Sequence, residues 1–168
     1  MSTLLLMRHA KSDWDASHAS DHDRPLNERG RRSARVMGRL LTSLGLIPDL
    51  VVTSTAVRAA TTAELAAAAG DWAAAIVPEP RLYGTGTDAA VDVVAETPPT
   101  GTLLLVGHQP TWGALAVALT GERVDMRTAT VAVISFPLHA WSAIGGTRGR
   151  LIEVHQPADH MGSHLDLD

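Results

Sequence analysis

The stretch Thr3-Leu4-Leu5-Leu6-Met7-Arg8-His9-Ala10-Lys11 decides the fold of this chain. Residues 3–7 form a mostly apolar run of the length that is typical of a buried strand. The run ends at Arg8-His9, where a cation and an imidazole follow the last apolar side chain. Ligands of open α/β sheets bind beyond the carboxyl ends of the strands. A cation and an imidazole at that point favour an anionic substrate and nucleophilic chemistry.

Apolar runs alternate with helical patterns along the rest of the chain. Further strands are expected at 50–53, 75–77, 102–106, 130–136 and 150–155, and helices at about 27–44, 56–69, 87–96 and 111–120. Asn27 is placed to cap the first helix. Strands that alternate with helices predict an α/β fold, a mostly parallel central sheet covered on both faces in three layers. We expect one domain over 1–155 and a polar, frayed tail over 156–168.

Composition narrows the function classes. The chain has 168 residues, 45% of them hydrophobic, which suits a single domain with a sizeable core. The formal net charge of −4 gives no general reason to bind nucleic acid or an anionic membrane. There is no cysteine, so disulfides, thiol nucleophiles and thiolate metal sites are excluded. The first apolar run is too short for a signal peptide, and we expect a cytoplasmic protein.

Three strand ends carry polar groups that suit one oxyanion. Arg8-His9 follows the first strand, Arg58 lies in the first turn of the helix after the second, and His108 follows the strand at 102–106. Parallel strands would bring these groups to one edge of the sheet. Arginine gives multi-donor contacts to phosphate, and helix N-termini add backbone donors. We expect Gly107 to let the backbone approach the ligand closely.

Each group taken alone has a structural explanation. An Arg-His pair after a strand is often a surface feature, Arg58 could pair with solvent or Glu64, and His108 could cap a loop. Their predicted convergence on one sheet edge favours a site. Trp14 is placed to form a wall of that site. The other tryptophans, Trp72, Trp112 and Trp141, are expected to be packing residues.

Four segments, in order along the chain, resemble the motifs of the histidine phosphatase superfamily. They are Arg8–Ala10 (RHA), Arg24–Gly30 (RPLNERG), Ser54–Ala63 (STAVRAATTA) and Val106–His108 (VGH). The short length, with Arg8–Trp14 (RHAKSDW) and Asp21–Leu26 (DHDRPL), most resembles the phosphohistidine phosphatase (SixA-like) branch. The resemblance implies a phosphoglycerate mutase-like fold for the domain.

The resemblance also implies a mechanism that agrees with the residues. Neutral His9 attacks phosphorus and forms a phosphohistidine, which water then hydrolyses. Arg8, Arg58 and His108 bind the phosphoryl oxygens and stabilise the transition state. No metal or cofactor is expected. The aspartates of the 13–23 loop are expected to be solvated or capping rather than Mg²⁺ ligands. A metal clip formed by His155, His160 and His164 is the less favoured alternative to a frayed tail.

The sequence departs from the superfamily pattern at the general acid. Gln109 follows His108, and no carboxylate lies near Tyr83-Gly84, where many members carry the acid. Weaker substitutes are Asp13, Asp21 and Glu79. A missing acid disfavours alkoxide leaving groups, which need a proton in the transition state. The labile P–N bond of a phosphohistidine needs less help.

Phosphohistidine on a protein is therefore the favoured substrate, with small phosphate monoesters as the alternative. A phospho-ligand binding module is the non-enzymatic alternative, although a pure binder would not need His9. A mutase is less favoured, because the short chain leaves little room for insertions that shield a phosphoryl group from water. The expected partner is a phosphorylated protein or small molecule, with no nucleic acid or membrane.

Overall fold

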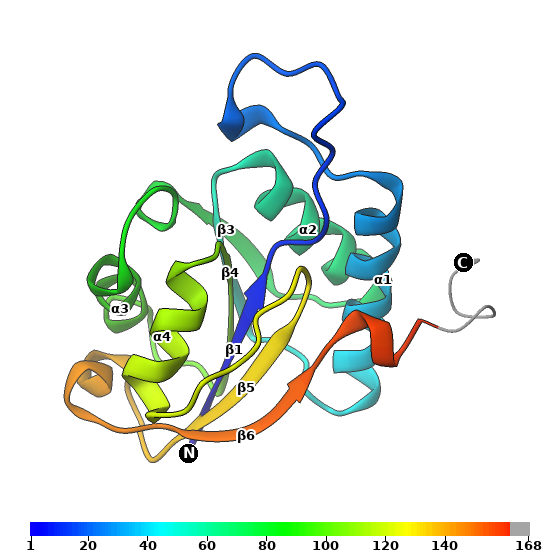
Figure 1. The fold of residues 1–168 in the computed structure, drawn as a ribbon. Coiled ribbons are helices and arrows are strands. Elements are labelled where there is room, and N and C mark those ends of the chain that lie inside the picture. Colours follow the sequence, from blue (N-terminus) through cyan, green and yellow to red (C-terminus); the bar gives the residue numbers. More distant parts are fainter. Residues whose placement is uncertain (162–168) are drawn as a thin grey trace.

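The computed structural model describes residues 1–161; residues 162–168, which include His164 and much of the predicted tail, lie outside the described residues. One six-stranded sheet runs through the domain in the order β3-β2-β4-β1-β5-β6 (Figure 1). The strands are β1 (Ser2–Arg8), β2 (Leu50–Ser54), β3 (Ala75–Glu79), β4 (Thr102–Gly107), β5 (Val131–Phe136) and β6 (Arg150–His155).

Helices cover both faces of the sheet. The α-helices are α1 (Glu28–Ser43), α2 (Val57–Gly70), α3 (Thr87–Ala95) and α4 (Thr111–Thr120). Short 3-10 helices are η1 (Asp21–Asp23), η2 (Pro80–Leu82), η3 (Trp141–Gly146) and η4 (Pro157–Asp159). Figure 1 shows α1 and α2 on one face and α3 and α4 on the other. The predicted three-layer α/β/α architecture is confirmed.

The sheet is parallel over β3, β2, β4 and β1, and β5 and β6 are added antiparallel. Arg8 at the end of β1 lies opposite Gly107 of β4, and Thr53 of β2 lies opposite Val106. The carboxyl ends of the three central strands are therefore level. His9, Ser54 and His108 follow at this one edge, as the sequence predicts.

Alternate side chains of β1 enter different cores. Leu4 and Leu6 pack on the α3–α4 side, whereas Leu5 and Met7 pack on the α1–α2 side. All four are fully buried. A strand that is apolar on both faces must lie inside the sheet with helices on either side, which explains why the opening run decides the fold.

Close backbone contacts position α1. The Asn27 side chain accepts a hydrogen bond from the Gly30 N–H at 2.8 Å, so the predicted cap is confirmed. A Cβ atom on Gly30 would lie 2.1 Å from the Lys11 carbonyl oxygen, and one on Gly38 would lie 2.1 Å from that of Ala66. Glycine at these positions lets α1 approach both α2 and the segment after His9.

The tryptophan predictions are confirmed, but the expectation for Gly107 is wrong. Trp72, Trp112 and Trp141 are 8%, 1% and 1% exposed. A Cβ atom on Gly107 would lie 2.3 Å from the Trp112 ring. Packing of Trp112 against the end of β4, rather than room for a ligand, therefore requires this glycine.

The described part of the chain continues past β6 as an ordered turn. Pro157 in η4 is buried, and the Ser33 hydroxyl lies 3.3 Å from the Met161 sulfur. These contacts join residues 156–161 to α1. Within residues 1–161, no helix combines the length and apolarity needed to cross a membrane.

Candidate active site

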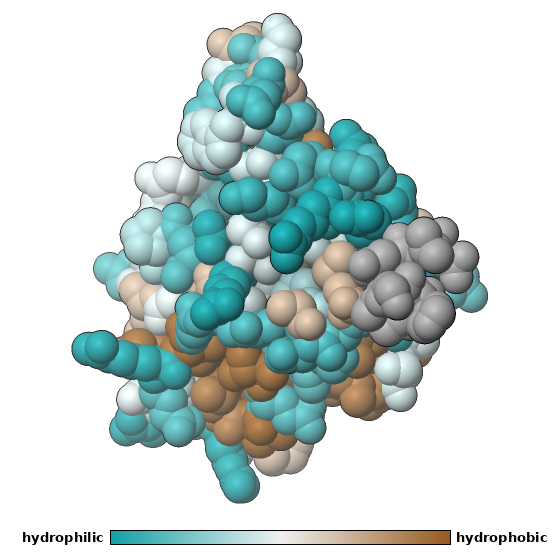
Figure 2. Space-filling model, turned by 45° about the vertical axis from the view of Figure 1, so that its right-hand side comes forward, coloured by the Kyte–Doolittle hydropathy of each residue, from teal (hydrophilic) through white to brown (hydrophobic). Residues whose placement is uncertain are grey.

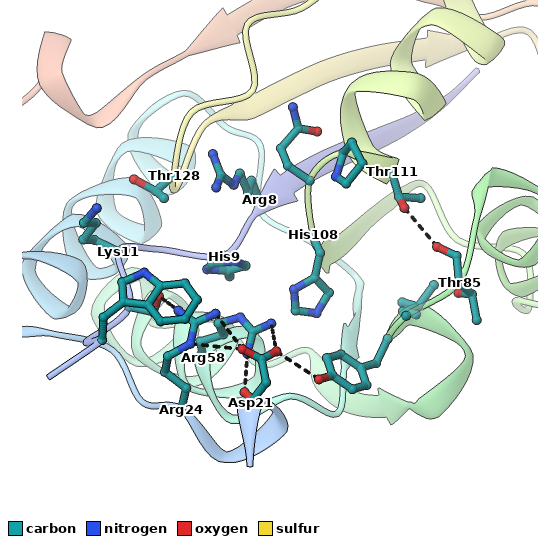
Figure 3. Close-up of a pocket in the computed structure, with 17 residues that line it drawn as sticks. Arg8, His9, Lys11, Asp21, Arg24, Arg58, Thr85, His108, Thr111 and Thr128 are labelled. Carbon is teal, nitrogen blue, oxygen red and sulfur yellow. Dashed lines mark hydrogen bonds and ion pairs between the residues drawn. The ribbon is translucent and has the colours of Figure 1, made fainter. Parts of the chain in front are cut away.

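A cavity of about 560 Å³ lies at the carboxyl edge of the sheet. The four residues predicted from the sequence, Arg8, His9, Arg58 and His108, all line it (Figure 3). The rings of His9 and His108 lie 5.1 Å apart between centroids. The structure therefore brings together two imidazoles and two guanidinium groups from three different segments of the chain.

The contacts of His9 fix which ring nitrogen can react. Its Nδ1 lies 2.7 Å from the Ala10 carbonyl oxygen. A carbonyl oxygen only accepts hydrogen bonds, so Nδ1 must carry the proton, and Nε2 then keeps the lone pair of the neutral ring. Burial lowers the pKa of His9 to about 3; the bond to Ala10 opposes this shift, while His108, Arg58 and Arg8 add to it. His9 is thus a neutral, oriented nitrogen base.

A threonine locks the backbone around the nucleophile. The Ala10 N–H donates to Thr62 Oγ1 at 3.0 Å, and that hydroxyl donates to the Arg58 carbonyl oxygen at 2.7 Å. Thr62 is fully buried on α2. It ties the residue after His9 to the helical turn that carries Arg58, so the nucleophile and the cation keep a fixed separation.

His108 is held by the end of β2. Its Nε2 lies 2.8 Å from Ser54 Oγ, which also accepts the Ala56 N–H at 3.2 Å. Burial lowers the pKa of His108 to about 4, and the charge of Arg58 lowers it further, although Asp21 opposes this. Both histidines are therefore uncharged at neutral pH, while the arginines carry the positive charge of the site.

Asp21 enters the site on the side opposite β1. Arg58, which is only 5% exposed, donates from Nη1 to the Asp21 carbonyl oxygen at 2.7 Å and from Nη2 to Oδ2 at 3.0 Å. Arg24 donates from Nη2 to Oδ1 at 3.1 Å, and the Tyr83 hydroxyl donates to Oδ2 at 3.0 Å. One carboxylate thus joins η1, α2 and the residue after η2 (Figure 3).

Residues 4–84 match the histidine phosphatase superfamily (branch 1). An uncharacterized protein of Mycobacterium tuberculosis is 36% identical over 163 residues, which cover 90% of this chain and 99% of that protein. A structure assigned as a phosphohistidine phosphatase SixA from Nakamurella multipartitia is 34% identical, with a TM-score of 0.79 over 93% of this chain and 96% of that one. The chain belongs to the SixA-like branch of the histidine phosphatase superfamily.

A second structure agrees with this assignment. It is described as a SixA phosphohistidine phosphatase of Agrobacterium tumefaciens, is 29% identical, and has a TM-score of 0.79 over 93% of this chain and 99% of that one. The three layers of this chain match the phosphoglycerate mutase-like fold of the superfamily. Membership of the superfamily supports phosphatase chemistry at this cavity. The residues that resemble the superfamily motifs are those that converge there.

The carboxylates of this chain have unequal access to the site. Asp13 accepts from the Asp15 and Ala16 N–H groups, and Glu79 accepts from Arg81; neither lines the cavity. Asp21 does line it. Its pKa is lowered to about 2, because hydrogen bonds from Arg24 and Tyr83 and the charge of Arg58 outweigh its desolvation. Asp21 is therefore an ionised acceptor rather than a proton donor.

Sequence reasoning missed how Asp21, Arg24 and Tyr83 act together. In the sequence, Arg24 appears only within a motif, Tyr83 only as the position near which an acid is missing, and Asp21 only as a weak candidate acid. The one local signal is the spacing of three residues between Asp21 and Arg24. The contacts to Arg58 and Tyr83 span 37 and 62 residues, and no periodic pattern reports such contacts.

The remaining predicted features differ in whether they line the cavity. Trp14 lines it and is 68% exposed, with the Arg24 guanidinium 3.5 Å from its ring centroid. Arg8 donates from Nη1 to the Met126 carbonyl oxygen at 3.1 Å. His155 and His160 do not line the cavity; their rings lie 5.7 Å apart between centroids, and residues 1–161 contain no cluster of three side chains suited to a metal ion.

Proposed function

We propose that this protein is a phosphatase that uses His9 as nucleophile, passes through a phosphohistidine intermediate, and acts on phosphohistidine of a protein. The observation that carries the proposal is the hydrogen bond from His9 Nδ1 to the Ala10 carbonyl oxygen. It leaves the Nε2 lone pair for attack on phosphorus, and the lowered pKa keeps that lone pair free of a proton.

Two displacements make up the proposed reaction. His9 Nε2 forms a bond to phosphorus while the bond to the leaving nitrogen breaks, and the leaving imidazole keeps the electron pair and takes up a proton from water. Water then attacks the phosphorus of phosphorylated His9, and the P–Nε2 bond breaks. Inorganic phosphate departs and His9 returns to its neutral form with Nδ1 still bonded to Ala10.

Arg8, Arg58 and His108 are proposed to hold the phosphoryl oxygens during both steps. The Ser54 hydroxyl supports this role for His108. The Ser54 hydroxyl lies 2.8 Å from His108 Nε2, and we assign the hydroxyl as the donor in this hydrogen bond. Donation from Ser54 to Nε2 leaves the proton of the His108 ring on Nδ1, where it can be donated to a phosphoryl oxygen. We propose that these residues suffice without a metal ion.

The substrate class follows from the carboxylates. Asp21 is the one carboxylate in the described cavity lining, and its pKa of about 2 makes it a poor proton donor at neutral pH. General acid catalysis typically contributes about 10² to 10⁴ in rate. We therefore expect P–N bonds and activated aryl esters to be cleaved faster than sugar or serine phosphates by a factor of that order.

An assay with chelator present tests the proposal. A histidine-phosphorylated protein, an aryl phosphate and a hexose phosphate would be compared in excess chelator, and a reaction quenched in base would be searched by mass spectrometry for phosphorylated His9. We expect unchanged rates with chelator and the lowest kcat/KM for the hexose phosphate. Equal hydrolysis of the hexose phosphate would overturn the substrate class. Loss of activity that Mg²⁺ or Zn²⁺ restores would overturn the mechanism.

A further inference from the structure

A second cavity, of about 240 Å³, adjoins the active site. Lys11 and Thr128 line both cavities, so each forms part of the wall between them. Figure 3 places these two residues on the side of His9 away from His108. Arg29, Arg127 and the turn that follows β6 complete the second cavity. Its described lining contains three cationic side chains and no carboxylate.

We propose that this second cavity is an anion subsite that binds carboxylates of the protein substrate beside its phosphohistidine. The inference rests on the proposed function, because it names the surface that such a substrate must present. A phosphoryl group in the active site and an acidic side chain in the subsite would be held together across Lys11 and Thr128. The substrate surface must then carry aspartate or glutamate next to the phosphorylated histidine.

Backbone contacts hold the subsite at a fixed distance from the nucleophile. The Ala129 N–H donates to the carbonyl oxygens of Arg8 and His9, at 3.0 and 3.1 Å, so the segment with Arg127 and Thr128 is anchored to the end of β1. On the other side, the Asn27 N–H donates to the Lys11 carbonyl oxygen at 3.0 Å. These bonds prearrange the two cavities, which lowers the ordering cost of binding.

The cationic groups of the subsite are available to a ligand. Arg127 pairs with Asp125 at 2.8 Å, but the two side chains are 69% and 67% exposed, and such a surface pair contributes little and exchanges readily. Within residues 1–161, Lys11 and Arg29 have no carboxylate within ion-pair distance. An acidic group of a partner would therefore meet cations without first breaking a strong internal pair.

Positive side chains along α1 continue the cationic surface beyond the second cavity, over a length that suits a protein rather than a small molecule. Five of the 14 basic residues lie in this helix, which has one acidic residue, although the whole chain has a net charge of −4. They are Arg29, Arg31, Arg32, Arg35 and Arg39. Figure 2 shows the strongly hydrophilic band over α1. From Arg29 to Arg39 the helix rises about 15 Å, which is longer than a small phosphorylated metabolite. An acidic surface of a protein substrate would be complementary in charge to the arginines of α1, and their positive potential would steer it toward the cavity.

The double variant Arg29→Gln and Arg127→Gln tests the proposal, since both side chains line only the second cavity. The matched control is Arg123→Gln with Arg150→Gln, which removes the same charge from exposed positions outside both cavities. Kinetics would be measured with a histidine-phosphorylated protein that has acidic residues beside its histidine, and with an aryl phosphate. We expect the ratio of the two kcat/KM values to fall about three- to tenfold in the double variant, mainly through KM, and to stay constant in the control.

A second substrate tests the chemistry of the ligand. Neutralising the acidic residues of the phosphorylated protein should lower its kcat/KM with the wild-type enzyme, and should remove most of the difference between wild type and double variant. Equal effects of the double variant and its control on the original substrate would overturn the subsite. A larger effect on a small bisphosphate than on the protein would identify the ligand as a second phosphate and overturn the protein assignment.

A binding measurement separates failure of the subsite from failure of the proposed function. Hexaglutamate peptide would be titrated into the wild-type protein at low salt, and backbone amide shifts would be recorded by NMR. We expect shifts at Thr128, Gln156 and Ala158 that the double variant lacks. If these shifts occur but no phosphohistidine protein is hydrolysed, the subsite stands and the substrate assignment is wrong. Shifts absent from these residues would overturn the subsite whatever the activity.

Discussion

The two sides of the active-site cavity are built in different ways. On one side, Arg8 ends β1, and His9 and His108 directly follow β1 and β4, which pair in register through the centre of the sheet. On the other side, η1 and the segment after η2 meet through one carboxylate, that of Asp21, which accepts hydrogen bonds from Arg58, Arg24 and Tyr83. Backbone pairing of β1 with β4 holds the first side, with support from the Thr62 and Ser54 hydroxyls, whereas the second side depends mainly on hydrogen bonds between side chains.

This difference separates chemistry from access. A nucleophile needs a fixed orientation, and the strand side supplies it with a buried backbone and an oriented imidazole. The loop side has a carboxylate that is 51% exposed, so solvent competes for its contacts more than for those of the buried His9. Arg58 belongs to both sides, because it emerges from α2 beside His9 yet is bonded to Asp21. Variants of the two sides should therefore differ in size and in kind.

The largest effect is expected on the strand side, from His9→Ala. Loss of the attacking nitrogen should lower kcat by roughly 10⁴-fold or more, as is found for nucleophiles that act together with other catalytic residues as a unit. The phosphorylated form should also vanish from base-quenched samples. Circular dichroism and thermal unfolding would check that the fold persists. Retention of more than a tenth of the activity would show that another residue is the nucleophile.

The next effect concerns the residue shared by both sides. Arg58→Ala should lower kcat/KM by roughly 10² to 10⁴, because a charged donor to the transferring phosphoryl group is lost. It should also release Asp21, so resistance of the 13–26 loop to proteolysis should fall. Arg58→Lys is the control that keeps the charge but not the two parallel donors. If the 13–26 loop of Arg58→Ala resisted proteolysis as well as that of the wild type, the position of Asp21 would not depend on this arginine.

The contrast between the strand side and the loop side also explains which parts of the site the sequence could predict. Strand positions follow from apolar runs, and parallel order brings their ends to one edge; Arg8, His9 and His108 were predicted on that basis. The start of α1 follows from Asn27, whose side chain caps the helix within a single turn. These are local signals or consequences of simple topology.

The loop side could not be predicted, because its order depends on contacts between distant side chains. Apart from its spacing of three residues to Arg24, nothing local distinguishes Asp21, which pairs with Arg58, from Asp23, which accepts a hydrogen bond from the Ser20 hydroxyl and does not line the cavity. Gly107 shows the same limit: a side chain at this position would meet the ring of Trp112, five residues later in α4, and no local pattern indicates that contact. The sequence likewise does not show whether Asp21 could serve as a general acid, because its ionisation depends on Arg24, Tyr83 and Arg58.

A smaller effect is expected on the loop side, from Asp21→Asn. The amide removes the charge that holds Arg24 and Arg58 and places an NH₂ group near donors. Hydrogen bonds to charged groups contribute about 1.5–3 kcal/mol when buried, and the half-exposed carboxylate should contribute less, so we expect about a five- to tenfold loss of kcat/KM, mainly through KM. Asp23→Asn is the matched control. A gain in kcat/KM for Asp21→Asn would instead show that Asp21 competes with phosphate for Arg58.

The smallest change is expected in the protonation of the site histidines when the free protein is placed in mild acid. An ordinary histidine would gain a proton under the same conditions. The pKa values of His9 and His108 are about 3 and about 4, both lowered first by burial. A histidine with a pKa of 6.5 would be about 3% neutral at pH 5, whereas these two should stay almost fully neutral. NMR titration of the imidazole resonances measures this without interference from ionisation of a substrate.

The two sides should then lose stability in different pH ranges. The unfolded histidines take up protons below about pH 6.5 while the folded ones resist, so the free energy of unfolding should fall as the pH drops from about 6.5 toward 4 and 3. Asp21 has a folded pKa of about 2 and an ordinary value of 3.8, so its contribution should be lost only as the pH falls below about 4. Removing His108 by His108→Gln should flatten the first range, and Asp21→Asn only the second. A His9 midpoint near 6.5 would mean that water reaches the ring, and the strand side would then be no more rigid than the loop side.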